Sequence, residues 1–218
     1  RSDKLGKLIN EHVCMLKASS YNWTEYISKV RSRSCIHPDV RRLPHPAAPL
    51  LDELRVTGAP ATFSTPPWSG EKNDEAVKYG CHKLAKEYQG FLEHEMVDFI
   101  EKGYYVLLPY SAVRHQRGLR CCPIGVVPQR DRQPRPISDY SFFGTNDDTI
   151  KRAPREAMQF GRTLERVLST IHHADPAQGP VYMLKIDISD GFYRVPVRTD
   201  DILSLGMVLP YQDGEEPM

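Results

Sequence analysis

The sequence lacks long apolar runs, paired cysteines and an excess of one charge. No run of about 18 apolar residues occurs in the 218-residue chain, so no transmembrane helix is expected. Its 5 cysteines include no C-x-x-C pair and indicate neither a zinc ribbon nor a disulfide framework. Basic and acidic residues number 29 and 28. No signal peptide is recognisable, so we expect an intracellular protein, in the cytoplasm or nucleus, with no membrane partner.

What the sequence does contain is the composition of an ordinary globular protein. Apolar residues make up 40% and charged residues 26% of the chain, which argues against disorder and is enough for a sizeable core. The length suits one large domain, or one domain with an arm. The first residue is Arg1 rather than methionine, and Met218 follows an acidic loop that closes no obvious element. We therefore expect a fragment of a longer polypeptide.

Hydrophobic periodicity predicts a helical first half and a mixed second half. Apolar residues at three- and four-residue spacing predict two helices within 1–34, a long helix over 74–102, and a helix that carries Leu164, Val167, Leu168 and Ile171. The proline-rich stretch 36–70 should be mostly extended, with a short helix at 50–54. Short apolar runs predict strands at 105–108, 124–127, 137–140, 181–188 and 205–209. The second half is therefore expected to be α+β.

A local excess of positive charge marks residues 123–146, which are expected to form a β-hairpin with a short charged turn. Six arginines stand between positions 114 and 135 against a single acid, Asp131; they are Arg114, Arg117, Arg120, Arg130, Arg132 and Arg135. Guanidinium groups match the geometry of phosphate oxygens, and basic surfaces gain affinity for nucleic acids by releasing counterions. The stretch therefore predicts a phosphate-binding hairpin. The alternative is a solvated basic loop.

A second candidate site follows the apolar run at 181–188. This run, expected to be a strand buried on both faces, ends in Asp187 and leads directly to Asp190, Gly191 and Phe192. A carboxylate at the end of a buried strand is costly unless it is paired or binds a metal. Nucleotidyl transfer uses such a carboxylate to hold divalent ions. Alternatively, Asp187 caps a turn or pairs with Lys185 or Arg194.

In this order, the two segments resemble the fingers and the first palm motif of reverse transcriptases, especially those of gypsy-like long-terminal-repeat retrotransposons and retrovirus-related Pol polyproteins. The matching residues are Val127-Pro128, Asp131, Arg135, Asp139-Tyr140 and Asn146, then Asp187, Gly191-Phe192 and Val195-Pro196-Val197. Residues 88–110 also look like the element that leads into the fingers, so the resemblance covers roughly residues 80–210. It implies a partial right-hand polymerase fold: an N-terminal arm or linker at 1–70, a fingers-like region at 71–160 and a partial palm at 161–218.

The resemblance also implies an activity, cofactors and partners. The parent would be an RNA-directed DNA polymerase that uses two Mg²⁺ ions, or Mn²⁺, and binds an RNA or DNA template-primer, dNTPs and the remainder of the Pol polyprotein. Asp187 would be the first catalytic aspartate and a metal ligand, and Phe192 the steric gate against ribonucleotides. The incoming dNTP would meet Arg135, Arg130, Gln129, Asp190, Gly191 and Phe192, with Gln129 standing where the family usually has lysine. Arg114, Arg117, Arg120 and Arg132 would contact nucleic acid.

Part of the catalytic set of the family is missing from these 218 residues. No Y-x-D-D turn follows Asp187, so we expect this chain to be inactive alone. Two alternatives remain: a catalytically dead retroelement relic or nucleic-acid-binding fragment, and an unrelated α+β domain in which Asp187 is only structural. Among the other residues, Tyr193 is expected in the core, and Asp139 and Tyr140 are expected to anchor the hairpin.

Overall fold

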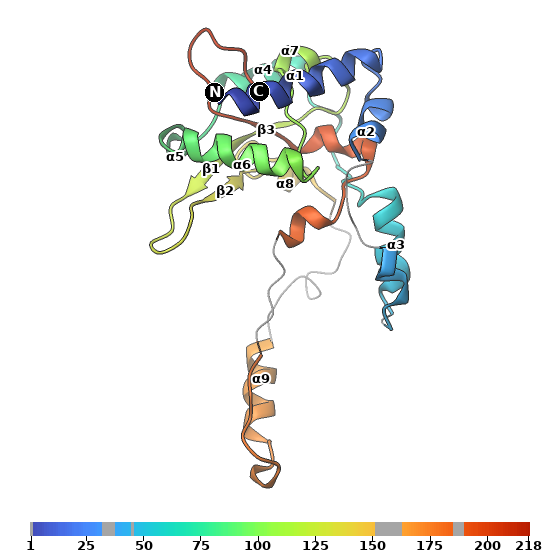
Figure 1. Cartoon of the computed structure of the whole chain (residues 1–218), viewed down its shortest axis with the longest axis vertical. Coiled ribbons are helices and arrows are strands. Elements are labelled where there is room, and N and C mark those ends of the chain that lie inside the picture. Colours follow the sequence, from blue (N-terminus) through green and yellow to red (C-terminus); the bar gives the residue numbers. More distant parts are fainter. Residues whose placement is uncertain (1, 32–37, 45, 151–162, 185–189) are drawn as a thin grey trace. The chain divides into compact units, whose positions relative to one another are not determined.

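A computed structural model describes residues 2–31, 38–44, 46–150, 163–184 and 190–218 of the chain. They fall into two compact units, one made of Arg1–Thr149 with Phe192–Met218, the other of Ile150–Gly191. The helical elements are α1 (Asp3–Ala18), α2 (Trp23–Arg31), η1 (Pro38–Arg42), α3 (Ala48–Thr57), α4 (Gly70–Tyr79), α5 (Lys83–Glu87), α6 (Gln89–Glu101), α7 (Tyr110–Val113), α8 (Thr145–Asp148), α9 (Thr163–His172), η3 (Pro176–Gln178), η4 (Gly191–Arg194) and η5 (Thr199–Leu205) (Figure 1). The strands are β1 (Cys121–Val127), β2 (Arg135–Ser138) and β3 (Gly206–Val208). None of the helices described is long and apolar enough to cross a bilayer.

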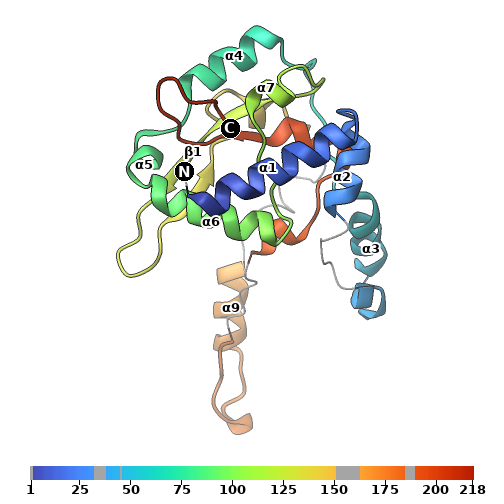
Figure 2. The same ribbon diagram turned by 45° about the horizontal axis from the view of Figure 1, so that its top comes forward.

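The first two helices form as the sequence predicts. Ser2 caps α1 by accepting a hydrogen bond from the amide of Leu5, and the apolar face of α1 is buried. This face packs on α6, and the two helices lie side by side in both views (Figures 1 and 2). Helix α2 contacts η5, where the indole of Trp23 donates a hydrogen bond of 3.1 Å to the carbonyl of Thr199. Both N-terminal helices are therefore part of the core of the larger unit.

The single helix predicted over 74–102 is wrong: the structure has three shorter helices, α4, α5 and α6. Helix α4 ends at Gly80, whose φ of +78° is a left-handed conformation that ends a helix and favours glycine. The chain then turns at Cys81 and His82, and the amide of His82 donates to the carbonyl of Ile124 in β1 at 3.0 Å. Helices α4 and α6 each bury one apolar face in the same unit. The apolar residues of the sequence therefore keep a helical spacing on both sides of the break.

The sheet has three strands in the order β2-β1-β3. Strand β1 is buried along nearly its whole length and pairs antiparallel with β2 and parallel with β3. The predicted hairpin is thus confirmed, and so is a strand within 205–209. About half of the chain is helical, so the α+β class is confirmed as well.

Two predicted strands differ from the structure. Residues 105–108 are irregular; they present side chains to the core and, within the described residues, pair with no strand. Residues 181–184 form no strand and are exposed, Leu184 to 84%, whereas the rest of that predicted strand lies outside the described residues. Helix α9, in the smaller unit, forms where its periodicity predicts, and its apolar positions are exposed there.

Candidate nucleic-acid interface

The hairpin of β1 and β2 has two faces of opposite character. Gly125 lies opposite Ile137, and Val127 lies opposite Arg135. Because directly opposed residues share a face and neighbours alternate, these four positions lie on one side of the hairpin and Ile124 and Val126 on the other. The Ile124 side is buried in the main apolar core, whereas Val127, Arg135 and Ile137 are exposed. Arg135 is therefore presented on the outer face.

The loop that joins the strands carries the predicted phosphate ligands. Arg130 and Arg132 are exposed, as is Arg135 at the first position of β2, and Gln129 is half-buried. Within the described parts of the chain, none of these three arginines forms an ion pair, and Asp131 is the single acid among them. Their guanidinium groups are thus unneutralised and available to an anion.

The other three predicted arginines are placed differently. Arg114 follows α7, is exposed, and lies 3.4 Å from the carboxylate of Asp74. Arg117 is exposed in the turn that follows. Arg120 is only 2% exposed, so the expectation that it contacts nucleic acid is corrected: it is an interior residue.

Arg120 is held by a dense set of contacts. Its guanidinium pairs with Asp148 at 2.7 Å and donates to the side chain of Thr65 at 2.9 Å. It also lies 4.2 Å from the ring centre of Phe63, in cation–π contact. Burial alone would raise the pKa of Asp148, but hydrogen bonds from Arg120 and Thr65 and the nearby positive charges hold that pKa below its usual value. This pair joins β1, α8 and the proline-rich segment, and it has no free donor surface for a ligand.

A hydrogen-bonded chain of side chains fixes the base of the hairpin. Asp139 accepts from the ring of His82 at 3.0 Å, and the other ring nitrogen of His82 is 3.2 Å from the hydroxyl of Tyr79. Asp139 also accepts from the amides of Ser141 and Phe142. On the inner side, the hydroxyl of Tyr140 donates to the carbonyl of Leu205 at 3.0 Å. Asp139 and Tyr140 therefore anchor the hairpin, as predicted.

Behind the hairpin lies a cavity of about 450 Å³ that brings both motifs together. Ser138 and Tyr140 line it from the hairpin, and Phe192, Tyr193 and 195–197 line it from the second motif. Tyr193 stacks on Tyr104 with ring centres 5.6 Å apart, so its predicted place in the core is confirmed. Phe192 is 95% exposed at the cavity. Of the six residues predicted to meet the incoming dNTP, Phe192 alone lines this cavity; Arg135 lies on the outer face of the hairpin, so the structure does not bring it together with Phe192.

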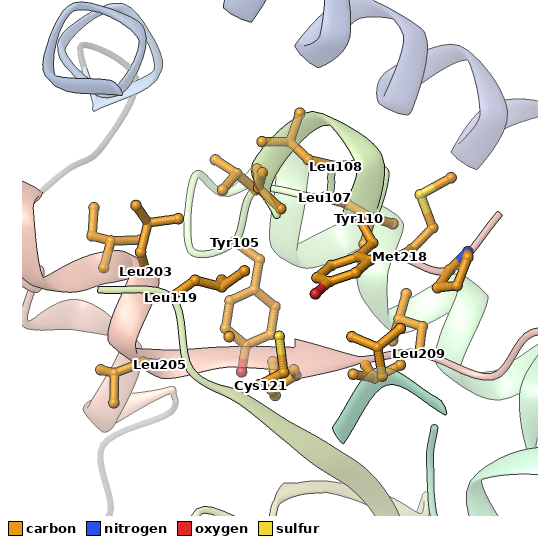
Figure 3. A pocket seen from close by; sticks show the side chains of 18 of the residues that line it. Tyr105, Leu107, Leu108, Tyr110, Leu119, Cys121, Leu203, Leu205, Leu209 and Met218 are labelled. Carbon is orange, nitrogen blue, oxygen red and sulfur yellow. The ribbon is translucent and has the colours of Figure 1, made fainter. Parts of the chain in front are cut away.

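A smaller cavity of about 160 Å³ is also lined by Tyr105 (Figure 3). Its walls are mostly apolar and include Leu119, Leu203 and Leu209. Burial raises the pKa of the Cys121 thiol at its wall to about 12, so the thiol is protonated and unreactive near neutral pH. No charged side chain is among the residues that line this cavity, so its side chains offer neither an acid nor a cation for chemistry.

The predicted metal site cannot be built from the described residues. Asp187 lies outside them, and no group of three or more histidine, cysteine or acidic side chains within them could hold a metal ion. Asp190 has a left-handed φ of +55° and, like Gly191, belongs to the smaller unit.

Sequence reasoning missed the aromatic residues around His82. The rings of Tyr79, His82 and Phe142 meet on the outer side of the sheet although up to 63 positions separate them in the chain. The adjacent pair Phe142-Phe143, directly after a predicted strand, was the one available signal. No protein-family profile matches the sequence, and neither a curated protein nor a solved structure matches it significantly.

Proposed function

We propose that this chain is a fragment of a retroelement reverse transcriptase, comprising the fingers and the first part of the palm, and that its cationic hairpin binds the template-primer. The observation that carries the proposal is the hairpin itself: the segment with the family motif forms two paired strands, and the loop between them exposes unpaired arginines. Guanidinium groups in this state bind phosphate oxygens in a bidentate manner.

The cavity behind the hairpin supports the same proposal. Two motifs more than 50 positions apart in sequence, at Tyr140 and Phe192, line it together. Its volume of about 450 Å³ lies within the range of small-ligand sites. We propose that the sugar of an incoming dNTP contacts Phe192 there. In the complete parent, Asp187 would help to hold two divalent ions, which would supply activation of the attacking primer hydroxyl and charge stabilisation of the leaving pyrophosphate.

Binding is the first part of the test. A labelled RNA–DNA template-primer is titrated with the 218-residue chain at several salt concentrations. We expect the logarithm of the association constant to fall linearly with the logarithm of the salt concentration, and the slope to decrease in magnitude by about 2 to 3 in Arg130→Gln/Arg132→Gln/Arg135→Gln. The matched control, Lys7→Gln/Lys17→Gln/Arg42→Gln, removes the same charge from exposed positions elsewhere and should leave the slope nearly unchanged. Equal effects of the two triple variants would contradict a role for the hairpin.

Primer extension is the second part. We expect no extension by this chain, and extension by a version continued through the downstream reading frame that is lost in Asp187→Asn. If the continued version binds but never extends a primer, the chain is a nucleic-acid-binding relic. Gln129, at the position where the family usually has lysine, favours that second candidate.

A further inference from the structure

Three aromatic rings form a partly exposed cluster at the base of the hairpin. The ring centres of Tyr79 and Phe142 are 4.6 Å apart with an interplanar angle of 36°. The ring of His82 lies 5.2 Å from that of Phe142, nearly perpendicular to it. Tyr79 and Phe142 are 43% and 46% exposed, unusual for rings that contact one another. We call these three residues the ring platform.

The ring platform is fixed before any ligand binds. Two hydrogen bonds, to Asp139 and to Tyr79, hold the ring of His82. Phe143 supports the platform from below, 4.8 Å from Phe142 and in edge contact with the indole of Trp68. A ligand therefore meets rings whose rotamers are already selected, which lowers the entropic cost of binding.

The ring platform lies on the same face of the sheet as Arg135. A Cβ at Gly125 would come within 3.2 Å of the His82 ring, so the ring covers the face towards which position 125 points. Val127 and Arg135 share that face, two strand positions further, which is roughly 7 Å. Ile137, 44% exposed, lies opposite Gly125 on β2, two positions from Arg135 and on the same face. The outer face thus runs from the clustered rings, across an apolar side chain, to a guanidinium that forms no ion pair within the described residues.

We propose that this outer face binds single-stranded nucleic acid, with unpaired bases stacked on Tyr79 and Phe142 while Arg135 and the loop arginines hold the neighbouring phosphates. The inference rests on the proposed function and adds a base-binding site that the motifs do not include. A flat apolar ring beside a cation matches a nucleotide, which joins a π-face to an anion within one residue. Glycine at position 125 leaves the His82 ring room against β1.

The test distinguishes binding to the bases from binding to the phosphates. Fluorescence anisotropy compares an oligouridine of about 12 nucleotides with an abasic ribose-phosphate chain of equal length, at one fixed salt concentration and then over a salt series. We expect the wild-type chain to prefer the oligouridine roughly tenfold. Tyr79→Leu/Phe142→Leu keeps apolar bulk but removes the rings; it should abolish this preference and leave the salt slope unchanged. The matched control is Tyr21→Leu, at an exposed ring far from the hairpin in sequence, and it should change neither quantity.

A second readout needs no variant. An oligonucleotide with 2-aminopurine at one position should lose fluorescence on binding the wild-type chain, because stacking on an aromatic ring quenches this base. Equal affinity for the two oligonucleotides, with a normal salt slope and no quenching, would overturn the ring platform and leave the proposed function intact. Absence of salt-dependent binding would overturn both. Dimerisation of the chain that is lost in Tyr79→Leu/Phe142→Leu would show that the rings contact a second copy instead.

Discussion

Arg120, directly before β1, and Arg135, the first residue of β2, belong to the same basic stretch of sequence but have opposite surroundings. Arg120 is 2% exposed, pairs with Asp148 and lies over the ring of Phe63, whereas Arg135 is exposed and unpaired within the described residues. An arginine thus links distant segments inside the protein at position 120, whereas at position 135 it presents an exposed positive charge. Local charge density in the sequence does not distinguish the two roles, because the partners of Arg120 lie 28 to 57 positions away.

The largest difference between the two sites should appear in stability, when Arg120 and Arg135 are each replaced by an uncharged residue. Arg120→Met leaves the carboxylate of Asp148 without its partner, and we expect a loss of about 3–5 kcal/mol in the free energy of unfolding. Arg135→Met should change it by no more than about 0.5 kcal/mol, since no contact is lost. Urea denaturation of both variants measures the difference. Equal stabilities would mean that the Arg120 pair does not form in solution.

Replacement of a closely packed glycine tests the same region without changing a charge. A Cβ at Gly206 would lie 2.8 Å from the carbonyl oxygen of Arg120, which accepts the hydrogen bond of the Gly206 amide. We expect Gly206→Ala to destabilise the chain by about 1–3 kcal/mol, because the two strands must separate. Gly6→Ala, in α1 with open space around it, is the control and should stabilise by up to about 1 kcal/mol. Denaturation midpoints report both.

Acid should weaken the Arg120 pair and spare the hairpin loop. The pKa of Asp148 is lower in the folded chain than in the unfolded one, so its contribution to stability is fully present above the unfolded value of about 4 and is lost as the pH falls through the folded value. We expect the urea midpoint to fall less between pH 5 and about 3 in Asp148→Asn than in wild type. An identical fall in both chains would show that this carboxylate does not titrate with folding.

The smallest effect concerns Arg135 alone. Arg135→Gln should weaken template-primer binding a few-fold and reduce the salt slope by about 1, because one phosphate contact is lost. Arg117→Gln, another exposed arginine before β1, gives a matched comparison. A larger effect at Arg117 than at Arg135 would place the phosphate path along the turn after α7 instead of along the hairpin.

Local patterns predicted much of this fold. The helices α1, α2 and α9 and the hairpin follow from apolar spacing. The break at Gly80 was missed because apolar residues keep helical spacing across it, although the glycine adopts a positive φ. Residues 105–108 have the apolar pattern of a strand, but within the described residues they line the core without pairing with one. Strand pairing depends on segments distant in the sequence, so the local pattern could not show this.

Of the candidate nucleic-acid interface, only the positive charges could be predicted from the sequence. The loop arginines were recognisable because they lie close together in the sequence, and their exposure follows from a turn between strands. The ring platform depends on α4 and the residues after β2 meeting in space, and the burial of Arg120 depends on Thr65 and Asp148. Such contacts between distant segments leave no periodic trace in the sequence.

The contact between α2 and η5 has a consequence for the order in which the protein folds. The indole of Trp23 bonds to Thr199 across 176 positions, and β1 completes its parallel pairing only with Gly206–Val208. Helix α2 is therefore synthesised long before η5, the segment that it contacts in the native structure. Closing such long loops is slow, because its entropic cost precedes any gain from the contacts. Apolar surface of α2 that η5 covers in the native structure must therefore stay uncovered until η5 has been made, and transiently exposed apolar surface of this kind favours aggregation.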